Sequence, residues 1–139
     1  MKFVWDDKYS VQVELIDEQH KKYFSIVNRI ADHLDLAQAD QQLLIEIVKE
    51  MVDYALYHFE TEEKYFLEFS CENCDGHIAE HNKYRSKMKE FLSKTEVIMD
   101  EDVAQLFEEI SVFAIEWFTS HILVEDKKYT QCFNEHGLQ

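Results

Sequence analysis

Histidines and one glutamate recur at helical spacing between His58 and His81. His58 and Glu62 lie four residues apart, and so do His77 and His81. In an α-helix four residues turn through about 400°, so the two side chains of each pair leave the helix on nearly the same side, one turn apart. Imidazole and carboxylate groups are common metal ligands. This stretch therefore predicts two helices that each present two metal ligands from one face.

Four segments of the chain repeat apolar residues at steps of three and four, the period of an amphipathic helix. Residues that can cap a helix N-terminus precede them. The expected helices are residues 18–37 after Asp17, one after Asp40, one after Asn73 or Asp75, and one after Asp100 or Asp102. The chain has no proline and two glycines, although a sheet protein needs such residues at its many tight turns. With short links, these helices predict an all-α fold, an antiparallel up-down-up-down four-helix bundle.

The N-terminal residues do not follow the helical period. Apolar and polar residues largely alternate there, but a single strand would have no partner in an all-α fold. We expect residues 1–16 to form an extended N-terminal arm that lies along a bundle made by residues 17–139. The chain of 139 residues is then a single domain, 1–139, with a core of its own.

Each expected helix places at least one imidazole or carboxylate among its apolar positions. A lone histidine in a core is usually a neutral, hydrogen-bonded imidazole. Here five of the seven histidines share such positions with a glutamate, and an acidic side chain is rarely buried without a partner because the burial is costly. The inward-facing set is His20, His58, Glu62, His77, His81 and His121. It predicts a metal centre in the core of the bundle.

Asp126 follows His121 by five residues, which in a regular helix turns it about 140° away from the face of the histidine. Two interpretations remain open on spacing alone. Either the helix is loosened between Ile122 and Glu125, for example as a π-bulge, and Asp126 faces the core, or Asp126 is a surface acid.

The number of ligands bears on the kind of metal. Five imidazoles and two carboxylates are too many for one ion but suit two ions bridged by the carboxylates. Structural zinc takes four ligands, often thiolates, and catalytic zinc needs three from the protein. A set this large fits a pair of redox-capable, six-coordinate ions, with iron the natural choice. Three histidines and the bridges fill one iron, whereas two histidines and the same bridges leave an open position on the other.

The charge and the lack of apolar runs exclude several classes of partner. The formal net charge is −15, which nucleic acid phosphates and anionic membrane surfaces would repel. No apolar run has the length of a membrane span, and the N-terminus lacks the apolar region of a secretory signal. We therefore expect a cytoplasmic monomer with no nucleic acid and no membrane partner.

The sequence resembles the hemerythrins over almost the whole chain, and among them the single-domain bacterial ones. The resemblance rests on Trp5 with Tyr9, on IDEQHKKYFSIVN around His20, on HFETEE and HIAEH, and on WFTSHILVED, which ends at Asp126. An HxxxE motif, an HxxxH motif fifteen residues after its glutamate, and an HxxxxD motif form a specific combination.

The resemblance implies a non-haem di-iron site that binds O2 reversibly. One iron is expected to bind His77, His81 and His121. The other iron, which keeps the open position for O2, is expected to bind His20 and His58. Glu62 and Asp126 would bridge the two irons (Fe2+ or Fe3+) beside an oxo or hydroxo group, so the resemblance makes Asp126 a ligand. Aromatic residues beside the ligands are expected to exclude water from the bound O2: Phe24, Phe59, Trp117 and Phe118.

Three functions are compatible with such a site. The first is reversible O2 binding for storage, delivery or scavenging, which we expect. The second is an oxygen or redox sensor, which would need a separate signalling partner because the chain holds nothing beyond the bundle. The third is a di-iron enzyme, a peroxidase, an oxidase or a nitric oxide reductase. It would need a proton donor near the open iron, for which Tyr84 or a neighbouring tyrosine is the candidate, so we do not expect an enzyme.

The three cysteines do not indicate a disulfide framework, because their number is odd. Cys71 and Cys74 form a CENC segment just before His77. They are either a redox pair acting on the helix that holds two ligands, or two solvent-side cysteines without a role. The second interpretation is favoured, since one CxxC is a weak motif. Cys132 is expected to have no role, and His33 and His136 are expected to be solvated.

Overall fold

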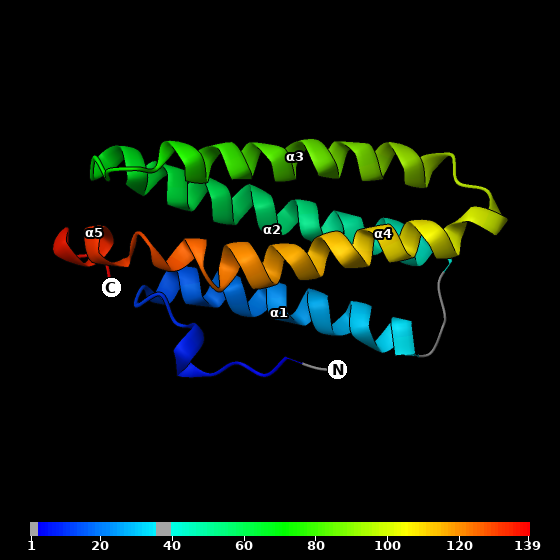
Figure 1. The fold of residues 1–139 in the computed structure, drawn as a ribbon, viewed down its shortest axis with the longest axis horizontal. Helices are drawn as coiled ribbons and strands as arrows, with labels where there is room; N and C mark the ends of the chain where they lie inside the picture. Colours follow the sequence, from blue (N-terminus) through cyan, green and yellow to red (C-terminus); the bar gives the residue numbers. More distant parts are fainter. Residues whose placement is uncertain (1–2, 36–39) are drawn as a thin grey trace.

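The computed structural model describes residues 3–35 and 40–139, and these ranges contain helices and no strand. The four long helices of the described chain are α1 (Glu14–Asp35), α2 (Gln41–Glu68), α3 (Asp75–Glu96) and α4 (Val103–Glu116). Each runs antiparallel to the one before it (Figure 1), and α2 packs against each of the other three. The expected all-α, up-down-up-down four-helix bundle is confirmed.

Among the described helices, none combines the length and the apolar character needed to cross a lipid bilayer.

The buried face of α2 shows why the apolar period predicts this fold. Residues of α2 at steps of three and four are buried in the structure, from Leu44, Ile47 and Met51 to His58 and Glu62. Steps of three and four keep them on one side of the helix. The same face thus carries both the hydrophobic core and two of the expected ligands.

The residues that were expected to cap the helix N-termini do so in one case and not in others. Asp40 caps α2 as expected, since its Oδ1 accepts the backbone N–H of Leu43 at 2.7 Å. The prediction that Asp17 caps the first helix is wrong, because α1 already begins at Glu14. Helix α3 begins at Asp75 and α4 at Val103, and neither start has a side-chain cap. The predicted end of the first helix at residue 37 lies outside the described residues.

Asp17 instead fastens the N-terminal arm to α1. Its Oδ2 accepts the hydroxyl of Ser10 at 2.6 Å and its Oδ1 accepts the backbone N–H of Val11 at 2.8 Å. Between these contacts and α1, Gln12 adopts φ 62°, a left-handed conformation that reverses the chain. The arm therefore ends at residue 13 and not at 16, and it contains the 3-10 turn η1 (Asp7–Tyr9).

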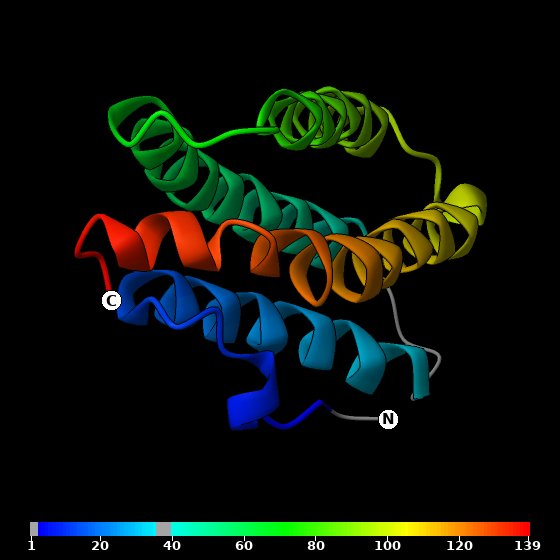
Figure 2. The ribbon, with the colours of Figure 1, turned by 60° about the vertical axis from the view of Figure 1, so that its left-hand side comes forward.

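The arm lies along the outer side of α1 (Figure 2). Trp5 and Tyr9 pack on Phe24 of α1, with ring centroids 5.3 and 5.2 Å from it. Phe3 packs on Phe118, 4.6 Å away. These contacts confirm an arm laid along the bundle, and they cover the side of α1 that carries His20.

A short fifth helix, α5 (Thr130–Glu135), was not predicted. It closes a second apolar cluster at the end of the bundle where α2 ends and α3 begins, and the cluster consists of Val11, Val13, Ile16, Phe66, Tyr129 and Phe133. Helix α5 also brings Cys132 to Cys71, and the two form a disulfide with Cα atoms 6.0 Å apart. The expectations that the chain has no disulfide and that Cys132 has no role are therefore wrong. Cys74 is the free cysteine.

The contacts of Asp17 predict a loss of stability in the D17A variant. The substitution leaves the hydroxyl of Ser10 and the N–H of Val11 without their acceptor, so we expect the free energy of unfolding to fall by about 2 kcal/mol. Urea denaturation followed by circular dichroism measures this. E18A is the matched control, because it removes only an exposed pair with Lys21 and should change stability little. Equal stabilities of D17A and E18A would contradict the role of Asp17.

Candidate metal centre

The end of α4 changes helix type before it reaches Asp126. After Glu116 the chain continues as a π-helix, η3 (Trp117–Ile122), and then as the 3-10 turn η4 (Glu125–Lys127). The backbone N–H of Leu123 donates to the carbonyl of Phe118, five residues earlier, at 3.2 Å. The loosened turn comes one turn earlier than expected. Asp126 is fully buried, so the surface interpretation is wrong and the inward one is confirmed.

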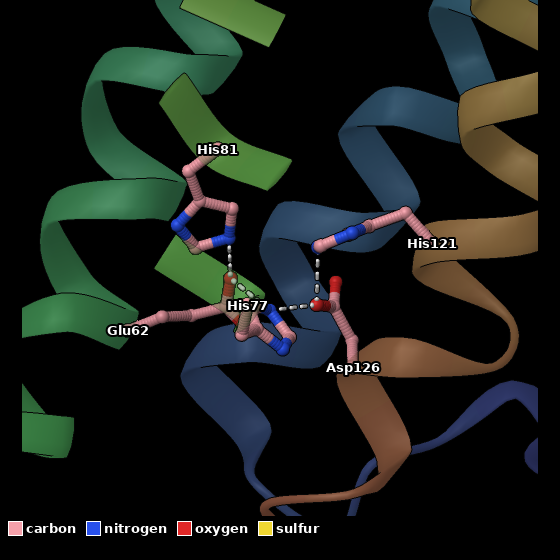
Figure 3. Close-up of side chains that lie close together, drawn as sticks. All are labelled: Glu62, His77, His81, His121 and Asp126. Atoms are coloured by element: carbon pink, nitrogen blue, oxygen red, sulfur yellow. Dashed lines mark ion pairs between the residues drawn. The ribbon is translucent and has the colours of Figure 1, made fainter. Parts of the chain in front are cut away.

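The structure brings all seven expected site residues together in the core. His77 is 8% exposed and the other six are at most 1% exposed. One group has its potential ligand atoms within 4.8 Å of one another, and it consists of Glu62, His77, His81, His121 and Asp126 (Figure 3). The same limit defines a second group of His20, His58 and Asp126.

Asp126 joins the two groups. Its Oδ1 lies 2.8 Å from Nε2 of His77 and 2.9 Å from Nε2 of His121. Its Oδ2 lies 2.8 Å from Nε2 of His20 and 3.1 Å from Nε2 of His58. Each carboxylate oxygen thus faces histidines of a different group.

Glu62 lies between the groups in a different way. Its Oε1 is 3.0 Å from Nε2 of His58 and 3.1 Å from Nε2 of His81. It is also 3.6 Å from Nε2 of His77. One oxygen of Glu62 therefore faces ligand nitrogens of both groups, although Glu62 is a member of the first group alone.

Several of these atoms are buried without a hydrogen-bond partner among the described residues. They are both carboxylate oxygens of Glu62, Oδ1 of Asp126, and Nε2 of His77, His81 and His121. Buried polar atoms nearly always have a partner, because leaving one without any is costly. Six such atoms that converge on one place without the geometry to bond one another fit a cation between them.

Charge within the cluster shifts the pKa values of its members. Burial alone would lower the pKa of His58, but the carboxylates of Glu62 and Asp126 outweigh it and raise this pKa to about 9. The same balance raises the pKa of His77 to about 10. The pKa of His81 is lowered by burial, with a contribution from neighbouring His77. A cation must therefore displace protons when it binds, as metals that take histidine ligands do.

The pKa values of both carboxyl groups lie well below their usual range. Burial raises the pKa of Asp126, but the imidazole of His121 and the other histidines lower it by more. Burial and Asp126 raise the pKa of Glu62, and His58 and His77 outweigh them. Both side chains are therefore anionic at neutral pH, as metal-bridging carboxylates must be.

Three histidines of the cluster are oriented through Nδ1 by side chains that were not predicted from the sequence. Nδ1 of His58 lies 2.8 Å from Oε1 of Gln19, and Nδ1 of His121 lies 2.6 Å from Oε2 of Glu80. Nδ1 of His81 lies 3.3 Å from Oε2 of Glu63. Such contacts fix the ring so that Nε2 is the free ligand nitrogen.

These orienting residues share a signal that the sequence does contain. Gln19, Glu63 and Glu80 are each the immediate neighbour of a site residue, namely of His20, Glu62 and His81. A residue one step from an inward ligand sits at the edge of the helix interface, where its side chain reaches the ligand of the next helix. Each of these residues therefore contacts a histidine on a helix other than its own.

Arg85 holds one of these orienting carboxylates. Its Nη1 and Nη2 donate to the two carboxylate oxygens of Glu63 at 3.1 and 2.6 Å. Its guanidinium also lies over the ring of Phe59, 5.2 Å from the centroid. A planar guanidinium that contacts both oxygens fixes the carboxylate, and through it the ring of His81.

Two of the four expected aromatic rings stack on histidines of the cluster. Phe59 stacks on His81 and Trp117 stacks on His121, each with ring centroids 3.9 Å apart. Phe24 and Phe118 are buried 4.6 Å from each other. Tyr54, which was not predicted from the sequence, stacks on His58 with ring centroids 4.9 Å apart. Its buried hydroxyl has no hydrogen-bond partner among the described residues.

The two remaining histidines lie outside the cluster. His136 is exposed, as expected, and stacks on Phe69. His33 is partly buried, and its Nδ1 is shielded from solvent without a hydrogen-bond partner among the described residues. The expectation of a solvated His33 is therefore wrong in part.

The contact between Glu80 and His121 predicts weaker metal binding in E80A. Loss of the acceptor frees the imidazole ring to rotate, so we expect affinity for Co2+ to fall about 10–100-fold. Competition with a chelator, read from the optical spectrum of Co2+, measures it. The control is E72A, which removes a carboxylate from the same surface cavity. Equal affinities of the two variants would show that Glu80 does not position His121.

Comparisons with known proteins agree with this geometry. The family model described as "Hemerythrin HHE cation binding domain" matches residues 11–132. A bacteriohemerythrin of Clostridium acetobutylicum is 29% identical over 91% of this chain and 98% of its own length. A bacteriohemerythrin of Stenotrophomonas maltophilia is 27% identical over 96% of this chain and 82% of its own. A myohemerythrin of Riftia pachyptila is 32% identical, covering 91% of this chain and 90% of its own. The chain belongs to the hemerythrin family.

Proposed function

We propose that this protein binds O2 reversibly at a non-haem di-iron centre. The observation that carries the proposal is the contact pattern of Asp126, whose two oxygens each face a different group of histidines. A carboxylate in that position suits two metal ions side by side better than one. The family resemblance supplies the identity of the ions and of the ligand.

The two groups divide the ligands unequally. His77, His81 and His121 would hold one iron, and His20 and His58 would hold the other. Glu62 and Asp126 would bridge them. When bound, the iron pair would supply the electrons that O2 takes up on binding and returns on release. The side with two histidines has one protein ligand fewer, so it is the side where O2 would bind.

The chain's own residues favour reversible binding over oxidation of other molecules. Phe24, which lies one turn after His20 on α1, is buried and packs on buried Phe118, with ring centroids 4.6 Å apart. We expect these two rings to keep water from the His20 side. Tyr84, the expected proton donor, instead donates its hydroxyl to the backbone carbonyl of Met51 at 3.1 Å. Because the hydroxyl of Tyr84 is already bonded, this tyrosine is not a free proton donor, which supports a binding protein.

A second candidate function is a di-iron enzyme that consumes peroxide or nitric oxide, and Tyr54 favours it. Its unbonded hydroxyl is buried beside His58. Burial, together with the charge of Asp126, raises the pKa of Tyr54 well above its usual value. The phenol therefore holds its proton firmly, which makes it a weak acid for catalysis and keeps O2 binding as the first candidate.

An optical spectrum with iron counted per chain tests both candidates. The protein is reduced without oxygen, exposed to air, and then freed of air again. We expect two irons per chain and a visible charge-transfer band that appears with O2 and fades on its removal. A band that converts irreversibly while peroxide is consumed would favour the enzyme, and no bound iron would overturn the site.

The D126N variant, compared with a variant of the adjacent acid, tests whether Asp126 bridges the two irons. It removes the carboxylate that faces both histidine groups, so we expect the iron content to fall to about one ion per chain or less and the O2-dependent band to be lost. Metal analysis and the same spectrum measure this. E125Q changes the adjacent acid, which pairs with Lys128, and should keep both irons. Two irons in D126N would contradict a bridging Asp126.

A further inference from the structure

All three cysteines border one surface cavity beside the metal centre. The cavity has a volume of about 460 Å³, and its lining includes Cys71, Cys74, Cys132, His77 and Tyr129. His77 belongs to the ligand cluster and Tyr129 belongs to the apolar cluster under α5. Each cysteine is partly exposed, so a small molecule in the cavity can reach the sulfur atoms.

The disulfide holds the segment that supplies Asp126. Cys132 lies six residues after Asp126, and its bond to Cys71 closes a separation of 61 residues. The other polar ties of this segment are single hydrogen bonds, such as Thr130 Oγ1 to the carbonyl of Val11 at 2.9 Å and Asn134 Nδ2 to the carbonyl of Gln12 at 3.0 Å. Lys127 also donates to the carbonyl of Lys8. The disulfide adds a covalent restraint to this segment six residues after Asp126.

We propose that Cys71, Cys74 and Cys132 form a thiol–disulfide exchange site whose substrate is a small dithiol, and that reduction there loosens the metal centre. The inference rests on the proposed function, because it concerns the retention of the same metal ions. It assigns a role to the CENC segment and to Cys132 together.

The exchange proceeds in two balanced steps. A thiolate of the dithiol attacks one sulfur of the Cys71–Cys132 bond, which breaks, so that a mixed disulfide forms and the other cysteine leaves as a thiolate. The second thiol of the reagent then attacks the mixed disulfide and releases the second cysteine. Two electrons pass from the dithiol, which becomes a cyclic disulfide, to the protein. Segment 125–138 is then held by its noncovalent contacts alone.

Cys74 provides an internal branch of the same chemistry. If its thiolate attacks the sulfur of Cys71, a Cys71–Cys74 bond forms and Cys132 leaves as a thiolate, with no net transfer of electrons. Burial and the charge of Asp75 raise the pKa of the Cys74 thiol, so the thiol stays protonated and the branch is slow at neutral pH. The Cys71–Cys132 bond is thus the resting state, and an external dithiol opens it.

The first test counts thiols and follows metal release. The protein is purified in air without reductant and loaded with Co2+, which the reductant does not alter. Alkylation and mass spectrometry should find one free thiol, at Cys74, and a Cys71–Cys132 crosslink. After brief treatment with dithiothreitol, we expect Co2+ to pass to a chelator about tenfold faster, because a loosened ligand segment holds metal less well. Three free thiols before treatment, or a release rate unchanged by reduction, would overturn the proposal.

The cysteine variants separate the exchange site from side effects of the reagent. C132S cannot form the crosslink, so it should release Co2+ at the fast rate with or without dithiothreitol. C74S keeps the crosslink, so dithiothreitol should speed its Co2+ release as in the unaltered protein. After incubation at high pH without reductant, the unaltered protein should yield some free Cys132 through the internal branch, and C74S should yield none. Acceleration by dithiothreitol in C132S would mean that the reagent extracts metal directly.

A measurement on the metal-free protein distinguishes failure of this inference from failure of the proposed function. Reduction should lower its melting temperature by about 10 °C, since a crosslink over a long loop restrains the unfolded chain. If the melting temperature falls in this way but the protein takes up no metal, the metal site is overturned and the crosslink only stabilises the fold. Two bound ions with no shift and no faster release would sink the exchange site alone.

Discussion

A buried carboxylate shared by four helical segments is the interaction on which the rest of this structure depends. Asp126 lies within 3.1 Å of histidines from α1, α2, α3 and η3. An ionised carboxylate in a protein core is tolerated only when opposite charge or a metal compensates for its lost hydration. The bundle must therefore bring all four segments to one point, and their apolar faces, which bury the surrounding core, position the imidazoles around that point.

The side chains that contact the Nδ1 atoms of the clustered histidines are arranged in one repeated pattern. Gln19 on α1 orients His58 on α2, Glu63 on α2 orients His81 on α3, and Glu80 on α3 orients His121 on η3. Each of α1, α2 and α3 thus supplies a residue of the cluster and, one residue away, the side chain that orients a histidine of the next helix. The orientation of a ring depends on the packing of two helices and not on one, which couples the fold of the bundle to the geometry of the site.

The sequence predicted the parts of this structure that depend on spacing within one helix. Faces such as Leu44 to Glu62 repeat at the helical period, so both the fold and six of the site residues followed from it. Asp126 could not be placed by spacing, because η3 and η4 change the helix type between it and His121, and only the family resemblance indicated its role. The role of Asp17 and the Cys71–Cys132 bond were missed because each joins elements whose proximity is a property of the folded chain. Glu63 and Glu80 stand beside site residues in the sequence, but the histidine that each one contacts lies on another helix and is known only from the folded chain.

The separation of 106 residues between His20 and Asp126 has a consequence for biosynthesis. During translation the helix that carries His20 is made well before η4, so His20 leaves the ribosome 106 residues ahead of Asp126. The carboxylate that contacts four histidines thus joins the cluster only after η4 has been made, and a nascent chain that ends earlier holds these histidines without Asp126. The proposed metal uptake would therefore follow the synthesis of η4, and a product that ends before η4 would lack Asp126 and be open to proteolysis.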